Sequence, residues 1–410
     1  MQKLLNEIKK EIKPEKNVEK EVDLFIKKIS KEIRKRKITA KAVTGGSISK
    51  GTFLKYDYDV DIFVKFGLKY KKKDISKMLG KILKDFNPVL VHGSRDYYQI
   101  KQDFNFEVVP VLDVKKPEQA ENVTDMSPMH SVWMKKNIKK LADDIRLAKH
   151  FCKANNLYGA ESYIRGFSGH VLDILVIYYK GFVNLLRNSQ KWRKDQVVDF
   201  YNYHKGMAHF NINKSKLSPL VVVDPIDSGR NAAAALNSKK IDEFKKLAKQ
   251  FLKTPSKKFF EKKKVTIENL KKKAGKGKLL VFNVGAKKGK QDVVGAKLFR
   301  SLEYIKRHLV ENEFDVSNYG WDWDKKTKAL FYFILKNEKL SKNKIWKGPP
   351  IDKKEHVVKF KKIYKDNYSK NKVIYARTKR KYNMAEKLIL DIAKTEFVSK
   401  KIKKIEKMPL

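Results

Sequence analysis

Two aspartates that alternate with apolar residues give the strongest chemical signal in this sequence. Residues 45 to 64 read GGSISKGTFLKYDYDVDIFV, with Asp59 and Asp61 inside the apolar run. Side chains at i and i+2 of a strand point to the same face, so the two carboxylates can share a divalent metal ion. The Gly-Ser turn before them offers backbone N–H groups and a hydroxyl at a predicted helix start, which suits a phosphate. Together these features predict a site for a metal-bound nucleoside triphosphate.

The same turn superficially imitates a phosphate-binding loop. Residues 46 to 52 read GSISKGT, but the lysine that should follow the second glycine is absent, and Thr52 stands there instead. The sequence therefore argues against a phosphate-loop ATPase. An isolated Gly-Ser is usually an ordinary capped turn, and only its spacing to the aspartate pair favours a functional interpretation.

A third carboxylate makes phosphoryl transfer the working hypothesis. Residues 104 to 112, FNFEVVPVL, predict another strand, in which Glu107 lies on the face opposite Phe106 and Val108. In a two-metal site Asp59 and Asp61 could bridge both ions, while Glu107 could bind the first and help to remove a proton from a 3′-hydroxyl. Taken alone, Glu107 would more often be an exposed strand residue.

The composition indicates a globular protein that binds a polyanion. The 410 residues include 95 Lys and Arg and only 46 Asp and Glu, which gives a formal net charge of +49. Such an excess, interleaved with Tyr, Phe and Trp, favours RNA or DNA over a lipid surface.

Other classes of protein are disfavoured. The best apolar run, residues 171 to 179, is too short to span a membrane and contains Asp173. The N-terminus resembles neither a signal nor a transit peptide, so we expect a soluble, cytoplasmic protein. The single cysteine, Cys152, fits a reducing compartment, and its helical spacing predicts a core residue and not a nucleophile. One cysteine and eight scattered histidines argue against structural zinc.

Hydrophobic periodicity predicts an α+β protein of several domains. We expect helices over residues 2 to 36, interrupted at Pro14, and then strands and a helix around the carboxylates, as a catalytic α+β module. The next predicted elements are a helix over 137 to 154, ended by two asparagines, and a buried helix that starts at a Ser168 cap; both belong to a helical domain. A further helix is predicted over 241 to 252.

The remainder of the chain predicts a second α+β region. Residues 256 to 291 contain thirteen lysines and two glutamates, which is typical of a solvated linker or face. Strand and helix patterns alternate after it, with a predicted turn at Gly348-Pro349-Pro350. The expected domains are residues 1–130, 131–255 and 256–410.

Several motifs in order resemble the polymerase β-like nucleotidyltransferases and, within them, the archaeal class I CCA-adding enzymes. The resemblance covers nearly the whole chain and rests on motifs in the order GSISKGTFLKYDYDVDIFV, EVVPV, DMSPMHSVWMKKNI, DDIRLAKHFCKANNLYGAESYIRGFSG, VVDPIDSGRNAAAAL, GAKLFRSLEYIKRHL and GPPIDKKEHVVKF. It implies a nucleotidyltransferase head, a helical neck, and an α+β body with an extended tail. It also implies addition of C, C and A to the 3′ end of tRNA from CTP and ATP, with Mg²⁺ and recognition of the acceptor and T-stem helix. Family similarity alone suggests a homodimer.

The resemblance also assigns roles to individual residues. It implies that Asp59, Asp61 and Glu107 bind the metal ions. It places the nucleotide, mainly its triphosphate, against Ser47, Lys50, His130, Lys149 and Tyr158, and it implies that Arg230 helps to present hydrogen-bonding groups to the base. Without the motif context, each of these would be read as a surface or core residue, and Arg230 could equally pair with Asp224 or Asp227.

The chain departs from the family pattern at two of these positions. The third carboxylate is commonly aspartate, and Glu107 is one methylene longer; position 50 is often arginine, whose fork Lys50 replaces with a point charge. Neither change removes the required charge. Three other functions stay open at this point: another RNA 3′-nucleotidyltransferase, such as a poly(A)-adding or oligoadenylate-making enzyme, a catalytically silent RNA-binding protein, and a basic ribosome-associated protein.

Overall fold

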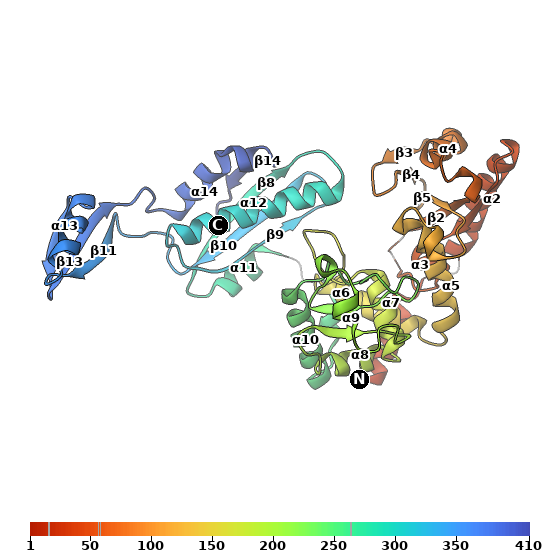
Figure 1. Ribbon diagram of the computed structural model, residues 1–410, viewed down its shortest axis with the longest axis horizontal. Coiled ribbons are helices and arrows are strands. Elements are labelled where there is room, and N and C mark those ends of the chain that lie inside the picture. The colour runs from red at the N-terminus through yellow and green to blue at the C-terminus, as the bar shows by residue number, and fades with distance from the viewer. Residues whose placement is uncertain (15–16, 56, 58, 263–264) are drawn as a thin grey trace. The chain divides into compact units, whose positions relative to one another are not determined.

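The computed structural model describes residues 1–14, 17–55, 57, 59–262 and 265–410. Tyr56 and Tyr58 of the aspartate motif therefore lie outside the described residues. The chain forms two compact units, Met1–Lys263 and Lys264–Leu410 (Figure 1). Each combines helices with β-sheet, so the predicted α+β class is confirmed.

A five-stranded mixed sheet carries the predicted carboxylates. Its order is β1 (Ala40–Thr44), β2 (Asp59–Phe66), β5 (Asn105–Leu112), β4 (Tyr97–Lys101) and β3 (Val89–Val91). Strands β2 and β5 run parallel, and the other neighbours are antiparallel. The residues between and after the two aspartates (Val60, Ile62 and Val64) are fully buried, as the alternation predicts.

Helices cover the apolar face of this sheet and shape the turn before β2. They are α2 (Asn17–Lys35), the four-residue α3 (Gly46–Ser49), α4 (Ile75–Ile82), and the 3-10 turns η1 (Leu68–Tyr70), η2 (Lys84–Phe86), η3 (Pro117–Gln119) and η4 (Val123–Met126). Phe25 of α2 stacks on Phe106 of β5 with ring centroids 4.1 Å apart. This stacking fixes α2 against the strand that carries Glu107.

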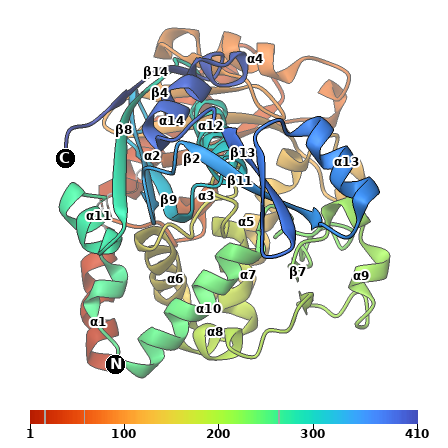
Figure 2. The same ribbon diagram turned by 90° about the vertical axis from the view of Figure 1, so that its left-hand side faces the viewer.

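A second, mainly helical core lies in the same unit. It is built from α1 (Gln2–Ile12), α5 (Ser127–Asn137), α6 (Ala142–Ala154), α7 (Gly169–Tyr178), α8 (Phe182–Ser189), α10 (Ser238–Lys253) and η6 (Lys257–Phe260), with the short parallel pair β6 (Gln196–Val198) and β7 (Leu220–Val222), α9 (Ala208–Asn211) and η5 (Lys214–Lys216). Both views show α6, α7, α8 and α10 gathered together (Figure 2). The first helix of the chain thus packs on α6 and not on the sheet.

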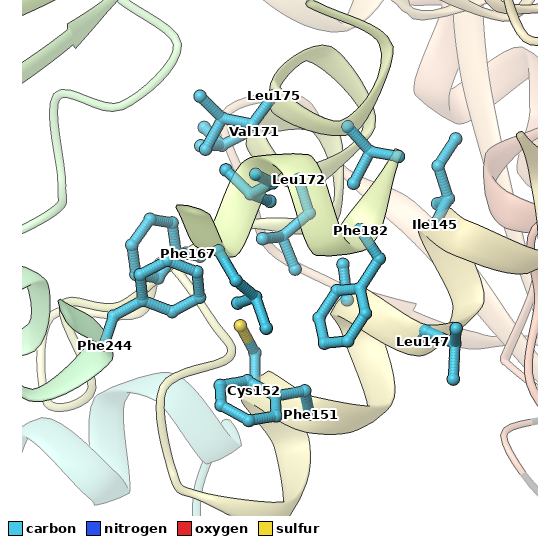
Figure 3. Packing of buried hydrophobic residues seen from close by; sticks show 14 of the residues in the cluster. Ile145, Leu147, Phe151, Cys152, Phe167, Val171, Leu172, Leu175, Phe182 and Phe244 are labelled. Carbon is cyan, nitrogen blue, oxygen red and sulfur yellow. The ribbon is translucent and has the colours of Figure 1, made fainter. Parts of the chain in front are cut away.

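Aromatic residues fill the centre of this helical core. Phe151 lies among Phe182, Phe244 and other rings, and Cys152 points into the same packing (Figure 3). Cys152 is fully buried, which confirms the predicted core role, and burial raises the pKa of its thiol far above the usual value.

Two expected helices are each broken in the structure. The helix predicted over 137 to 154 begins only at Ala142, because α5 ends at Asn137 and Lys139 adopts a left-handed φ of 44°. Its predicted end is confirmed, since Asn155 caps α6. The helix after the Ser168 cap is also confirmed at its start, where the Ser168 hydroxyl accepts from the Val171 N–H, but Gly181 at φ 130° divides it into α7 and α8.

The second unit contains two antiparallel sheets. The larger has the order β14 (Ile402–Lys407), β8 (Lys278–Ala286), β10 (Lys328–Leu335) and β9 (Val316–Trp323), packed against α12 (Gln291–Glu311), α14 (Ala385–Lys394) and α15 (Glu396–Ser399) on one face and α11 (Ile267–Ala274) on the other. The smaller has the order β11 (Asn343–Pro350), β13 (Val373–Lys379) and β12 (Asn367–Lys370), with α13 (Lys354–Ile363) beside β11.

Of two predictions for this region, one is right in part and one is wrong. The lysine-rich run 256 to 291 is not a linker, since it forms η6, α11 and β8 and buries Phe260, Leu270 and Phe282, but most of its described lysines are exposed, as expected for a solvated face. The segment Gly348-Pro349-Pro350 is the end of β11 and not a turn. Because β11 lies at the edge of its sheet, the missing proline N–H groups are tolerated there.

Among the described residues, no single helix is long and apolar enough to cross a membrane. The pair α7 and α8 passes by composition only when the two are joined, and they are bent by 90°.

Candidate nucleotide site

Two parallel strands place the three predicted carboxylates side by side. Asp61 of β2 is the register partner of Glu107 of β5, and Asp59 is the partner of Asn105. The Asn105 amide donates to Asp59 Oδ1 at 3.1 Å, and Gln99 of β4 donates to Glu107 Oε1 at 2.9 Å. The sheet therefore brings together carboxylates that lie 46 residues apart in the sequence, and neighbouring amides orient two of them.

The electrostatics of this cluster favour a bound cation. Burial, together with the neighbouring Glu107 and Asp59 carboxylates, raises the pKa of Asp61 to about 7 against the opposing effect of Lys50. Carboxylate oxygens are the ligands that hard divalent cations prefer. The residues present therefore fit a divalent metal.

The Gly-Ser turn is held directly against Asp61. The Gly45 N–H donates to the Asp61 carbonyl at 2.7 Å, and Gly46 adopts a left-handed φ of 53°. A Cβ at Gly46 would lie 1.7 Å from Asp61 Oδ2, so only glycine fits. The turn thus positions Ser47 beside the carboxylates.

A cleft of about 270 Å³ opens next to the turn and the carboxylates. Of the predicted residues, it is lined by Ser47, Lys50, Asp59, Asp61, Lys149 and Tyr158. It is also lined by residues that had not been predicted, namely Gly46, Asp57, Lys153, Gly169, His170 and Asp173. Burial raises the pKa of Tyr158 well above its usual value, so its hydroxyl stays protonated as a hydrogen-bond donor.

One fully buried carboxylate holds the two lysines of the cleft. Asp173 of α7 contacts Lys50 Nζ at 2.9 Å and Lys149 Nζ at 3.0 Å. Lys149 also donates to the buried Thr52 hydroxyl at 2.9 Å. Burial alone would raise the pKa of Asp173, but the two ammonium groups outweigh it and hold that pKa below its usual value. Around Asp173, therefore, two ammonium groups share one carboxylate.

Three predicted residues, Glu107, His130 and Arg230, are not part of the cleft lining, and the last two meet at a second buried carboxylate. His130 Nε2 lies 2.9 Å from Asp224 Oδ1, and Arg230 pairs with Asp224 Oδ2. Burial would raise the pKa of Asp224, but hydrogen bonds from His130 and His170 hold it far below its usual value. The ion pair between Arg230 and Asp224, which the sequence left open as an alternative to a role in base recognition, is therefore present.

His170 links this second group to the cleft. It lines the cleft, its ring lies 4.3 Å from that of His130, and its Nε2 lies 3.4 Å from Asp224 Oδ2. Burial lowers its pKa to about 4, so His170 is neutral at pH 7. His130, His170 and Asp224 place possible ligand atoms within 4.8 Å of one another, but Arg230 already engages the carboxylate.

Sequence reasoning missed some residues for which a signal existed. Asp173 is a charged residue inside an otherwise apolar helix, which marks a buried charge with a partner. Lys153 follows Lys149 by one helical turn and therefore faces the same side. Asp57, which pairs with Lys153, precedes the aspartate motif by two residues and carried no separate signal.

The fold and this site define a nucleotidyltransferase of the polymerase β-like class. Residues 26–121 match the model of the nucleotidyltransferase domain. Residues 143–261 match the second domain of tRNA nucleotidyltransferase, and residues 278–407 match the C-terminal domain of the CCA-adding enzyme.

Curated relatives narrow the class to one family. A CCA-adding enzyme of Nanoarchaeum equitans is 36% identical over 75% of this chain and 76% of its own length. A CCA-adding enzyme of Methanocaldococcus jannaschii is 28% identical over 96% of this chain and 90% of its own length. The chain belongs to the family of the CCA-adding enzymes.

Solved structures support the fold over 64% of the chain. A cytoplasmic RNA terminal U-transferase matches with a TM-score of 0.52 and 15% sequence identity, over 64% of this chain and 98% of that one. A Cid1 poly(U) polymerase structure described as bound to Mg and 3′-dATP gives a TM-score of 0.51 over the same shares.

Proposed function

We propose that this chain adds C, C and A to the 3′ end of tRNA, using CTP and ATP with Mg²⁺ and releasing pyrophosphate. The observation that carries the proposal is the pairing of Asp61 with Glu107 across β2 and β5, with Asp59 two residues away, beside a cleft lined by Lys50 and the buried Lys149. Family membership supplies the reaction and the RNA substrate.

The three carboxylates would hold the metal ions. When bound, two divalent ions would activate the primer 3′-hydroxyl and neutralise the departing pyrophosphate. Gln99 orients Glu107, and this contact fixes a side chain that is one methylene longer than the family's usual aspartate. In this proposal Glu107 would accept the hydroxyl proton.

The cleft residues would hold the triphosphate. Lys50 and Lys149 supply the positive charge, and the hydroxyls of Ser47 and Tyr158 supply hydrogen-bond donors. His130 is the remaining contact carried over from the family pattern. In this proposal catalysis comes mainly from positioning and electrostatic stabilisation, as is usual for nucleotidyl transfer.

Base recognition would use Arg230. Asp224 contacts both Arg230 and His130, so one buried carboxylate orients the proposed base contact and a proposed phosphate contact together. We assign the head to residues 1–130, the neck to 131–255, and the tRNA-binding body and tail to 256–410. The net charge of +49 suits the A-form acceptor and T-stem helix, and tRNA affinity should fall steeply with salt.

The test is incorporation into tRNA that ends at the discriminator base, with each labelled triphosphate supplied separately and the product sequenced at its 3′ end. We expect two C residues from CTP alone and a complete CCA end from CTP with ATP. Long A tracts, U addition, or failure to use CTP would refute the assignment in favour of another RNA 3′-nucleotidyltransferase, whose fold this chain shares.

The variant Asp59→Ala/Asp61→Ala separates catalysis from binding. Incorporation should be abolished while tRNA binding persists, because the carboxylates contact metal and not RNA. Asp85→Ala, at an exposed aspartate of the same domain, is the matched control and should retain full activity. Residual incorporation by the double variant would contradict the assigned metal ligands.

A further inference from the structure

Residues 199 to 211 present an exposed aromatic surface on the first unit. Tyr201 is 46% exposed, Tyr203 48% and Phe210 78%. Large aromatic side chains are usually covered in a monomer, and a group of them in one segment marks a binding surface. None of the proposed metal, triphosphate or base contacts uses this surface.

Hydrogen bonds fix the two tyrosines in place. The Trp133 indole N–H donates to the Tyr201 hydroxyl at 3.1 Å, and the Tyr203 hydroxyl donates to the Pro225 carbonyl at 3.1 Å. The two rings lie 5.4 Å apart at an angle of 53°. Phe200 makes edge contacts with both Trp133 and Tyr201. Rings held in this way lose little conformational entropy when a flat ligand stacks on them.

The pair adjoins the proposed base-binding segment. Pro225 follows Asp224 directly, and His204 Nε2 donates to the Ser228 carbonyl at 2.7 Å, two residues before Arg230. Trp133 follows His130 by three residues on α5, about one helical turn. The tyrosines therefore contact Trp133 and Pro225, which are close neighbours in the sequence of His130 and Asp224.

The surrounding charge favours a nucleic acid. Residues 191 to 216 contain six Lys or Arg and two Asp, and Lys191, Arg193, Lys194 and Lys205 are all exposed. Fixed aromatic rings in a segment rich in exposed cationic side chains are typical of sites that bind unpaired nucleotides, whose bases stack and whose phosphates are neutralised. A protein partner or a second copy would not require this charge.

We propose that Tyr201 and Tyr203 form a stacking platform for an unpaired nucleotide of the RNA substrate, next to the end that is being extended. The proposal rests on the proposed function, because that function supplies a single-stranded RNA 3′ end. It adds a binding site for the primer strand to the contacts made with the incoming nucleotide. Stacking tolerates any base, so the platform serves each of the successive additions.

Photocrosslinking of the full-length protein tests the platform directly. The probe is an RNA hairpin of acceptor and T stem with an unpaired 3′ strand that carries 5-iodouridine at one position at a time. Peptide mapping should place a crosslink on Tyr201 or Tyr203 in the wild-type protein. Crosslinks from every position that fall only outside residues 199 to 211 would overturn the proposal, and this result needs no variant.

Kinetics on matched variants provide the second measurement. Tyr201→Leu/Tyr203→Leu removes the rings but keeps apolar bulk, and should raise KM for the RNA at least about fivefold with KM for CTP unchanged. Tyr201→Phe/Tyr203→Phe keeps the rings and should stay within about twofold. Tyr178→Leu, at a tyrosine that is 39% exposed on α7, is the control.

The outcomes separate this proposal from the function on which it rests. Wild-type protein that adds no nucleotide refutes the proposed function. Wild-type protein that adds CCA, with a Leu variant of unchanged RNA KM, refutes only the platform. Equal defects in the Leu and Phe variants would show that the hydroxyl hydrogen bonds matter and that stacking does not, which refutes the platform. A changed sedimentation coefficient with an unchanged KM for the RNA would show that the surface is a protein interface, which also refutes it.

Discussion

Removing the charge of Asp173 should destabilise the first unit strongly in the absence of nucleotide. The carboxylate is fully buried and neutralises Lys50 and Lys149, whose side chains are only 11% and 5% exposed. Breaking a buried ion pair by removing one partner costs about 3–5 kcal/mol, since the other charge is left buried and uncompensated. We expect Asp173→Asn to lose about 3 kcal/mol, the lower end, because a buried lysine can release its proton. In a unit of this size such a loss lowers Tm by roughly 6 to 12 °C.

The pH dependence of this loss identifies its cause. Burial lowers the pKa of Lys149, and Asp173 is the main group that opposes this effect, while Lys50 and Lys153 add to it. In the Asn variant the pKa of Lys149 therefore falls further. A lysine with a lowered pKa binds fewer protons in the folded protein than in the unfolded one, so the free energy of unfolding rises with pH through that range. The difference between variant and wild type should shrink from pH 7 to pH 10.

Denaturation by urea, followed at several pH values with and without pyrophosphate, is the assay. Pyrophosphate supplies the missing negative charge, so it should stabilise the variant more than the wild type. Glu243→Gln removes a half-exposed partner of Lys240 and should change stability by less than about 1 kcal/mol. A pH-independent deficit, or a variant as stable as the wild type, would refute the idea that Asp173 acts as the counter-charge of the lysines.

Three further predictions concern the same site and the core behind it. Asp61, with a pKa of about 7, must lose its proton to bind a metal, so the affinity for Mn²⁺ should fall by up to about tenfold for each pH unit below pH 7, and binding should release a proton. Calorimetry in buffers of different ionisation enthalpy measures both, and a pH-independent affinity would contradict the prediction. Gly46→Ala should reduce incorporation at least about a hundredfold while circular dichroism stays native, since its Cβ would overlap Asp61 Oδ2; a fully active variant would show that the turn can move. Cys152 should not react with a thiol reagent in the native protein and should react at once in urea, because the thiol is buried and its pKa is raised; rapid native labelling would disprove the packing in Figure 3.

The sequence was sufficient where local pattern decides the structure. Alternation around Asp59 and Asp61 predicted both the strand and its buried face, and the Ser168 cap predicted the start of α7. The breaks at Lys139 and Gly181 were missed because the apolar stripe continues across them, and only packing in three dimensions reveals that the chain turns there. The error at Pro349 has the same origin, since a pairing with β13, more than twenty residues away, decides that the segment is a strand.

The residues of the candidate site also differ in how far the sequence could predict them. The carboxylate pair and the Gly-Ser turn lie close together in the sequence, so their spacing alone predicted a site. The contacts that connect the other residues span the chain: Lys50 and Asp173 are separated by 123 positions, and His130 and Asp224 by 94. No local pattern contains these pairs. The place of Asp173 and His170 in the site was therefore identified only from the fold, and His130, Lys149 and Arg230 were predicted only from the family resemblance.

The cleft carries charged side chains of both signs. Burial and the neighbouring carboxylates raise the pKa of Asp61, so its negative charge is disfavoured; burial and Lys50 lower the pKa of Lys149 against the opposing effect of Asp173, so its positive charge is disfavoured too. A cation alone relieves the first and a phosphate alone relieves the second. Under the proposed function, a triphosphate that carries a divalent cation would relieve both at once, because the carboxylates of β2 would hold the metal and Lys149 of α6 would hold the phosphates. The arrangement therefore selects the metal–nucleotide complex as a whole, because each half of that ligand lowers the electrostatic cost that opposes the other.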